Sequence, residues 1–222
     1  MGGISFIEDS SLFWIRADGS GKPQRLSQSS GDEFPLSFTP DAKWLAWGSS
    51  ISPVEGDSEK WRLGKSESIQ NLQASLPYAA FSPDGHWLAC ASSESGRSEV
   101  YVRALPGTGG KWQISNAGGV MPAWSRAGRE LFFRTVEESR IMVAAYETNG
   151  DSFVPGKPRL WSEKAFTTIS VYPNFDIAPD GKRFAVLMSA EKPGDKKPRN
   201  ELTVLLNFFT EVRRRAAAGE GR

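Results

Sequence analysis

The sequence has very little of the side chains that most often build metal and redox sites. Its 222 residues include one histidine and one cysteine. Cys90 cannot form an intrachain disulfide, and it lies in an apolar run, where a free thiol behaves as a small hydrophobic side chain. His86 and Cys90 together cannot supply the several ligands at fixed spacing that a histidine-and-cysteine metal site needs. We therefore expect no disulfide, no metal and no cofactor.

An excess of one charge and a long apolar run are also missing. The 27 basic residues nearly balance the 26 acidic ones, so the chain lacks the electrostatic footprint of a nucleic-acid-binding protein. Two short basic stretches, 192–199 and 213–215, are interpreted as a solvated loop and a polar tail, with a patch for phosphate or an anionic surface as the alternative. No window approaches the roughly 18 apolar residues of a membrane span. The first residues also lack the features of a signal peptide, so the compartment stays open.

Glycine and proline, in contrast, are plentiful, with 22 and 14 residues spread along the chain. They mark a motif that occurs four times, as "FTPDAKWLAW", "FSPDGHWLAC", "WSRAGRELFF" and "IAPDGKRFAV". The copies begin at Phe38, Phe81, Trp124 and Ile177, which are 43, 43 and 53 positions apart. A period of about 40–45 residues is typical of propeller blades.

Each copy has the same internal plan. A short apolar stretch precedes the turn, an apolar or alternating run follows it, and after a polar loop comes an alternating third segment such as "SEVYVRAL" or "RIMVAAYE". This pattern predicts an all-β fold, a partial β-propeller of four to five blades with up to four antiparallel strands each. The predicted boundaries are a partial blade at 1–31, blades at about 32–75, 76–118, 119–168 and 169–210, and a disordered tail at 211–222. Because the partial blade lacks its innermost strand, we expect open sheet edges and self-association.

The turn itself has readable chemistry. Proline presets the backbone, the following aspartate can bond the turn, and glycine accepts the left-handed conformation that closes it. We expect Asp41, Asp84 and Asp180 each to bond its own turn rather than to serve as catalytic carboxylates. Ala42 replaces glycine in the first copy and would cost roughly 1–2 kcal/mol at positive φ. His86 occupies a position where the other copies have lysine or arginine, so it is interpreted as a solvent-facing residue rather than a catalytic base.

The eight tryptophans divide into two groups. We expect four of them to pack in the core between blades: Trp44, Trp47, Trp87 and Trp124. The other four are predicted in outer strands, where some could be exposed and anchor a peptide or a sugar: Trp14, Trp61, Trp112 and Trp161.

These residues resemble the TolB-like, WD-repeat-like β-propellers of bacteria. The likeness is carried by Phe81–Gly85, by the strand Trp87–Cys90, by Val100–Val102 and by the pair Ile114 and Ser115, and similar segments cover nearly the whole chain. The stretch "NELTVLLNFFTEVRRR" also resembles the close of propellers that follow a serine/threonine kinase domain and a membrane span in some soil bacteria. That resemblance implies an extracytoplasmic (periplasmic) sensor or docking platform and a chain that is the C-terminal part of a longer propeller, although no kinase motif is present here.

From these patterns we predict a non-enzymatic binding module with a protein or peptide partner, and we assign no catalytic, cofactor-binding or metal-binding residue. Three long loops are the candidate binding surface: Ser49–Lys60, Ser92–Glu99 and Ser189–Glu201. The alternatives are a hydrolase or lyase that uses carboxylates on a propeller face, a regulatory gate domain of a hydrolase, and a structural remnant without a ligand.

Overall fold

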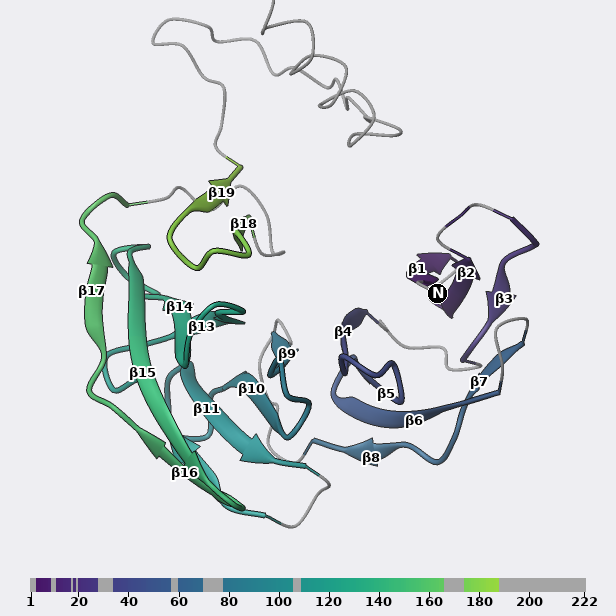
Figure 1. The fold of residues 1–222 in the computed structure, drawn as a ribbon, viewed down its shortest axis with the longest axis horizontal. Helices are drawn as coiled ribbons and strands as arrows, with labels where there is room; N and C mark the ends of the chain where they lie inside the picture. The colour runs from purple at the N-terminus through teal and green to yellow at the C-terminus, as the bar shows by residue number, and fades with distance from the viewer. Residues whose placement is uncertain are drawn as a thin grey trace, which may run out of the picture. The chain divides into compact units, whose positions relative to one another are not determined.

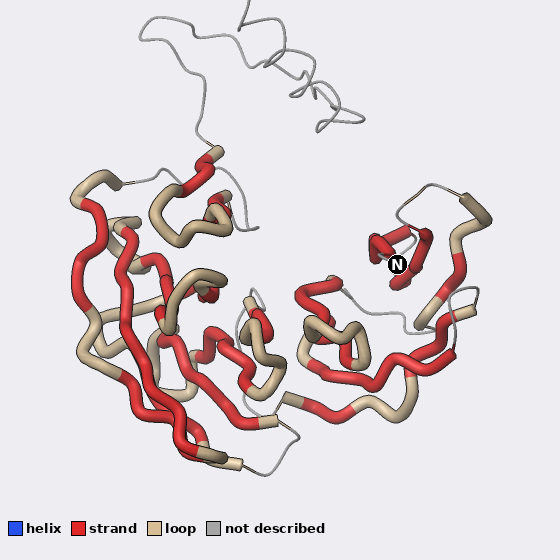
Figure 2. The backbone as a smooth tube through the Cα atoms, viewed as in Figure 1, coloured by secondary structure: helices blue, strands red, loops and turns tan. Residues whose placement is uncertain are grey.

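The described part of the chain consists of strands and loops. The structure, a computed structural model, describes residues 3–8, 11–16, 18, 20–27, 34–56, 60–69, 78–105, 109–165 and 174–187, and gives side-chain positions from residue 11 onward. No helix occurs among these residues (Figure 2). By its contacts the chain divides into the units 1–189 and 190–222, and all described residues belong to the first. The predicted loop 189–201, the blade segment after residue 187 and the tail lie outside the described residues.

The strands form five antiparallel sheets (Figure 1). The first contains β1 (Gly3–Glu8), β2 (Ser11–Arg16) and β3 (Gln24–Arg25). The second contains β4 (Pro35–Phe38), β5 (Trp44–Trp47), β6 (Ser50–Gly56), β7 (Trp61–Leu63) and β8 (Glu67–Ser68). The third contains β9 (Ala79–Phe81), β10 (Trp87–Ser92), β11 (Glu99–Ala104) and β12 (Lys111–Gln113). The fourth contains β13 (Val120–Trp124), β14 (Glu130–Arg134), β15 (Ile141–Asn149), β16 (Ser152–Pro155) and β17 (Arg159–Ser162). The fifth contains β18 (Phe175–Ile177) and β19 (Phe184–Val186).

Each later sheet touches the sheet before it through its own first strand. β1 contacts β4, β4 contacts β9, and β13 contacts both β9 and β18. Such a series of small antiparallel sheets, joined strand by strand in sequence order, is the architecture of a β-propeller. The predicted all-β fold is therefore confirmed.

The four predicted turns occupy equivalent places, between the first and second strands of their sheets. In each turn, one residue donates its backbone N–H to a carbonyl on the other side of the turn. This residue stands just before Pro-Asp or, in the third copy, before Arg126-Ala127. Ser82, for example, donates to the Trp87 carbonyl at 2.8 Å. Ala42, Gly85 and Gly181 all have positive φ, at 57°, 76° and 66°, so the expected strain at Ala42 is present. Gly128 in the "WSRAGRELFF" copy has no positive φ, so this turn closes differently once Pro-Asp is replaced.

A second recurring contact links the last two strands of the first and third sheets. The hydroxyl of Ser27 accepts the Leu12 N–H at 2.9 Å, and the hydroxyl of Ser115 accepts the Val100 N–H at 2.8 Å. Both serines are buried, so each hydroxyl satisfies a backbone donor that water cannot reach. These contacts make Ser27 equivalent to Ser115, and they make Ser11 equivalent to Glu99.

The third strands of the second and fourth sheets are longer than the sequence pattern suggested. Ser49–Lys60 is not a loop, because Ser50–Gly56 forms β6, which begins directly after the two-residue turn Gly48-Ser49 and pairs with β5. β6 then continues and pairs with β7, as β15 continues and pairs with β16. The β15–β16 hairpin contributes part of the longer, 53-residue spacing between the last two copies of the motif, whereas the β6–β7 hairpin fits within a 43-residue spacing.

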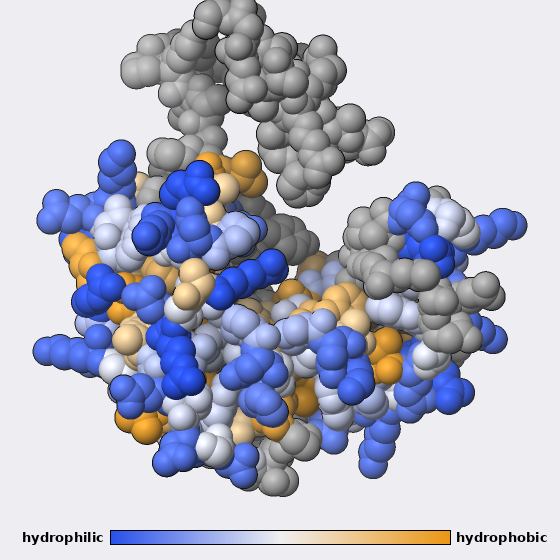
Figure 3. Space-filling model, viewed as in Figure 1, coloured by the Kyte–Doolittle hydropathy of each residue, from blue (hydrophilic) through white to orange (hydrophobic). Residues whose placement is uncertain are grey.

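Apolar side chains are buried within and between the sheets, while the face in view in Figure 3 is mostly hydrophilic. Trp87 and Trp124 are core residues, as predicted, and Trp44 is half-buried. Trp47 is likewise half-buried, and its indole N–H donates to the Ser52 hydroxyl at 2.9 Å. Trp14 is fully buried although it lies in an outer strand, and the other three tryptophans of that group are half-buried.

Candidate functional site

The two ends of the sheets differ in their polar side chains. At the end that carries the Pro-Asp-Gly turns, the turn aspartates and His86 are exposed. At the opposite end, where the second strands finish and the third strands begin, Glu99 and Arg134 are buried together with Ser92 and Ser115. We call these the turn end and the loop end. Because buried charged groups are rare unless they are held by specific contacts, the loop end holds the candidate site.

The polar side chains of the turn end stabilise the turns themselves. Asp84 accepts hydrogen bonds from the Ser82 hydroxyl at 2.5 Å and from the His86 N–H at 3.0 Å. Asp41 accepts the equivalent bonds from Thr39 and Lys43, and these hold the pKa of its carboxyl below the ordinary value, the Thr39 hydroxyl contributing most. Asp180 accepts the Lys182 N–H at 3.0 Å, and its pKa is likewise lowered, mainly by this bond. Each aspartate therefore bonds its own turn, as predicted.

Glu99 is the centre of the loop end. It is the first residue of β11, its exposed fraction is 0%, and it stands where the first sheet has Ser11. One carboxylate oxygen accepts from Arg97 Nε at 2.6 Å and from the Gly118 N–H at 3.0 Å. The other accepts from the Ser115 hydroxyl. Three donors on one buried carboxylate satisfy its charge without water.

These contacts tie together two loops from different places in the sequence. Residues 93–98 connect β10 to β11, and residues 114–119 connect β12 to β13. Arg97 also donates to the Asn116 carbonyl, and the Gly119 N–H donates to the Ser98 carbonyl at 2.8 Å. We call this set of contacts around Glu99 the loop clasp. It fixes both loops while the Arg97 side chain stays 59% exposed.

Two glycines make the clasp possible. Gly118 has a φ of +86°, a conformation that other residues adopt only with strain. A Cβ on Gly119 would lie 2.5 Å from the Ser115 hydroxyl oxygen, which is too close. The two glycines of "SNAGGV" therefore allow the second loop to approach Glu99.

A third loop, 135–140, lies beside the clasp. A Cβ on Gly118 would meet Val136, whose side chain is partly exposed, at 3.4 Å. Arg134, just before this loop, is buried, and its Nη1 donates to the Ser139 hydroxyl at 3.2 Å. Burial lowers the pKa of Arg134 and raises the pKa of the buried Tyr78, which the positive charge of Arg134 partly opposes. Met121 follows Val120, which pairs with Arg134 across the sheet. It has a φ of 56° and lies within the bulge between Val120 and Ala123.

The three loops predicted as the binding surface have different outcomes in the structure. Ser92–Glu99 contains the clasp, Ser49–Lys60 is largely strand β6, and Ser189–Glu201 lies outside the described residues. Sequence reasoning did not identify Ser115 and Gly118 as partners of Glu99. The sequence signal that could have identified them is the alignment of β2 with β11, in which Glu99 stands at the position of Ser11.

Other chemistry is limited in the described residues. Burial raises the pKa of the Cys90 thiol to about 11, so Cys90 is a core residue and a poor nucleophile. Within the described ranges, no three or more His, Cys, Asp or Glu side chains are placed to hold a metal ion. No helix in the same residues has the length and apolar character of a membrane span.

Comparison with known proteins identifies fold relatives only. No family model matches the chain, and no curated protein matches it. A functionally unknown protein from Desulfotomaculum acetoxidans is similar over 84% of this chain and 58% of its own, with 13% identity and a TM-score of 0.50. TolB from Acinetobacter baumannii matches over 78% of this chain and 58% of its own, with 15% identity and a TM-score of 0.36. A protein titled as a candidate 6-phosphogluconolactonase, from Bacteroides uniformis, matches over 78% of this chain and 56% of its own, with 19% identity and a TM-score of 0.47.

Sequence identities this low support a similarity of fold and nothing about function. The chain spans less than three fifths of the length of each of these three proteins. The fold rests on the sheets described above, and function has to be argued from the site.

Proposed function

We propose that this chain is a non-enzymatic binding module that recognises a protein or peptide through its loop end. The observation that carries the proposal is the loop clasp: a buried glutamate, absent from the equivalent position of the first sheet, is used to hold two loops in one arrangement. Loops fixed before a partner arrives lose less conformational entropy on binding. The clasp also leaves Arg97 exposed and oriented, and arginine is one of the residues that contribute most to interfaces.

The bonding of the carboxylates supports binding over catalysis. A hydrolase or lyase of this fold would need titratable groups that converge on one place. In the described ranges, the turn aspartates are bonded within their own turns at one end of the sheets, and Glu99 accepts three donors at the other. A carboxylate that holds loops in this way is poorly placed to exchange a proton with a substrate. The hydrolase, lyase and gate-domain alternatives therefore rank below the binding module.

Site-specific crosslinking tests the proposal. A photoreactive amino acid is placed at Ser95 in the loop end or at His86 in the turn end, both exposed, and the chain is expressed in its source organism. We expect a discrete crosslinked product from position 95 and none from position 86. Equal products at both positions, or a product from the turn end alone, would contradict the proposal.

A charge-matched pair of variants then tests the clasp. Glu99→Gln removes the charge that holds the loops, whereas Glu138→Gln removes an exposed charge from the neighbouring loop. Because hydrogen bonds to a charged group contribute about 1.5–3 kcal/mol, we expect Glu99→Gln to lower the crosslinked yield from position 95 by about tenfold or more. Glu138→Gln should leave it nearly unchanged. Equal yields from both variants would show that the clasp does not organise the binding surface.

We also infer two finer points from the sequence. The resemblance of residues 200–215 to propellers that follow a kinase domain and a membrane span favours a sensor or docking platform outside the cytoplasm, and the coding sequence upstream of Met1 tests this. The open edge of β1 favours self-association, because the described residues contain no strand that pairs with its second edge.

A further inference from the structure

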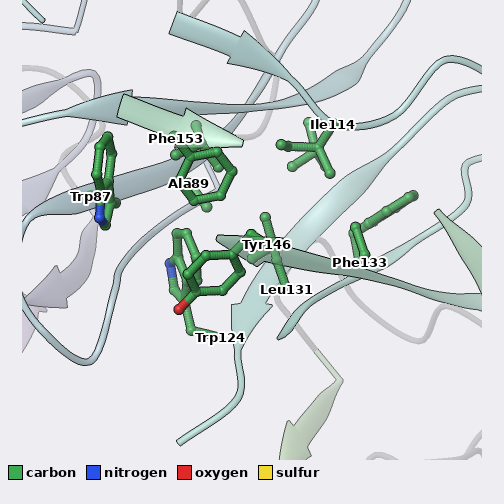
Figure 4. Packing of buried hydrophobic residues seen from close by; sticks show 11 residues of the cluster. Trp87, Ala89, Ile114, Trp124, Leu131, Phe133, Tyr146 and Phe153 are labelled. Atoms are coloured by element: carbon green, nitrogen blue, oxygen red, sulfur yellow. The ribbon is translucent and has the colours of Figure 1, made fainter. Parts of the chain in front are cut away.

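Two hairpins reach from one sheet onto the sheet before it. In the fourth sheet, β15 continues beyond its pairing with β14 and forms a hairpin with β16. Phe153 on β16 is 2% exposed, and its ring lies 5.2 Å from Trp87 and 5.8 Å from Trp112, both in the third sheet. Figure 4 shows Phe153 beside Trp87 and Ala89, with Tyr146 of β15 next to Trp124.

The second sheet repeats this arrangement. β6 continues past its pairing with β5 and forms a hairpin with β7. Trp61 on β7 stacks on Trp14 of the first sheet, with ring centroids 4.7 Å apart and planes 20° apart. The backbone N–H of Trp61 also donates to the Gln24 side-chain oxygen of the first sheet at 3.2 Å. We call the β6–β7 and β15–β16 hairpins the latch hairpins.

We propose that the latch hairpins are conformational straps that couple the opening of neighbouring sheets, the second to the first and the fourth to the third. A two-stranded hairpin is only marginally stable by itself in water, so each hairpin depends on the aromatic contact that it makes. The contact in turn covers tryptophans that belong to the preceding sheet. Opening either partner therefore exposes apolar surface of the other, and this couples the two sheets in the proposal.

The third sheet shows the contrast. There β11 pairs with β10 and then directly with β12, and the described part of this sheet contains no latch hairpin. The second and third sheets touch through β4 and β9, and both contribute to one buried apolar cluster that includes Ile51 and Leu88. The straps therefore define two coupled pairs and leave the junction between the second and third sheets without one in the described residues.

Hydrogen exchange of the intact chain tests the strap with an internal control. Phe153→Ala removes the aromatic contact, whereas Val154→Ala changes the adjacent residue of the same hairpin, which is 54% exposed. We expect Phe153→Ala to raise the exchange rates of the β10–β12 amides by about tenfold or more, because a buried phenylalanine contributes strongly to core packing. Val154→Ala should leave these rates within about twofold of the original protein, as exposed substitutions usually do.

The pattern of exchange distinguishes the possible outcomes. Faster exchange in β10–β12 and β15–β16, with the first and second sheets unchanged, supports the strap. Faster exchange confined to β15–β16 would overturn it, since the hairpin would then open without the third sheet. A uniform rise over every sheet would also overturn it, because the fourth and third sheets would then not form a separate unit. Trp61→Ala, compared with the exposed control Arg62→Ala, repeats the test in the first and second sheets and keeps it decisive if Phe153→Ala fails to fold.

Discussion

At the scale of single residues, the turn copies offer a reciprocal exchange between Ala42 and Gly85. Ala42 has a φ of 57° and Gly85 a φ of 76°, so both occupy the left-handed region. A Cβ on Gly85 would meet only Pro40 Cδ at 3.5 Å, an ordinary contact, so the cost of alanine there is conformational strain rather than a clash. The pair therefore measures backbone strain in nearly constant surroundings.

We expect Ala42→Gly to stabilise the protein by about 0.5–1 kcal/mol, because relief of left-handed strain exceeds the added flexibility of glycine in the unfolded chain. Gly85→Ala should destabilise it by about the same amount. Urea denaturation monitored by tryptophan fluorescence measures both changes. A loss of stability in Ala42→Gly would refute the strain argument.

At the scale of elements, the paired serines Ser27 and Ser115 share one role but not the same surroundings. Each accepts the N–H of the second residue of a strand, Leu12 of β2 or Val100 of β11, and Ser115 also donates to Glu99. Their substitution by alanine therefore separates the contact that recurs in the fold from the contact that belongs to the candidate site.

We expect Ser27→Ala to lower the free energy of unfolding by about 1–3 kcal/mol, the cost of an unsatisfied buried donor. Ser115→Ala should cost more, by roughly a further 1.5 kcal/mol or above, because the charged Glu99 also loses a donor. Chemical denaturation of both variants at one pH measures the difference. Equal losses would mean that the Ser115 to Glu99 bond contributes nothing to stability.

The elements also show what could be predicted from the sequence. The turns were predictable because Pro, Asp and Gly act locally, within five residues of one another. β6 was not, because serine and proline in "SSISPVEG" are typical of loops and the strand is decided by pairing with β5 and by the buried Ile51. β16 was missed for a related reason: the position of Phe153 depends on two tryptophans that lie more than forty residues earlier in the sequence. Glu99 was included in a candidate loop, but its role depends on contacts with a second loop that no local pattern predicts.

At the scale of the whole molecule, the first sheet carries the strand edge that we propose for self-association. Its order is β1-β2-β3, and β1 contacts β4 of the second sheet. An unpaired strand edge presents a row of backbone donors and acceptors to any extended segment that approaches. If the proposed self-association occurs through this edge, it depends on those backbone groups, and removing one N–H should weaken it.

Two proline variants of β1, Phe6→Pro and Ile7→Pro, separate the two edges of this strand. Successive N–H groups of a strand point to opposite edges, so one variant removes a donor that faces β2 and the other removes a donor from the open edge. We expect one variant to lose stability through the broken β1–β2 pairing. The other should keep the fold and lose association, since proline is tolerated at an edge strand when its missing N–H faced solvent. Multi-angle light scattering over a range of concentrations, with circular dichroism as the folding control, measures both. A monodisperse monomer in the unmodified chain at every concentration, or unchanged association in both folded variants, would exclude the β1 edge as the contact.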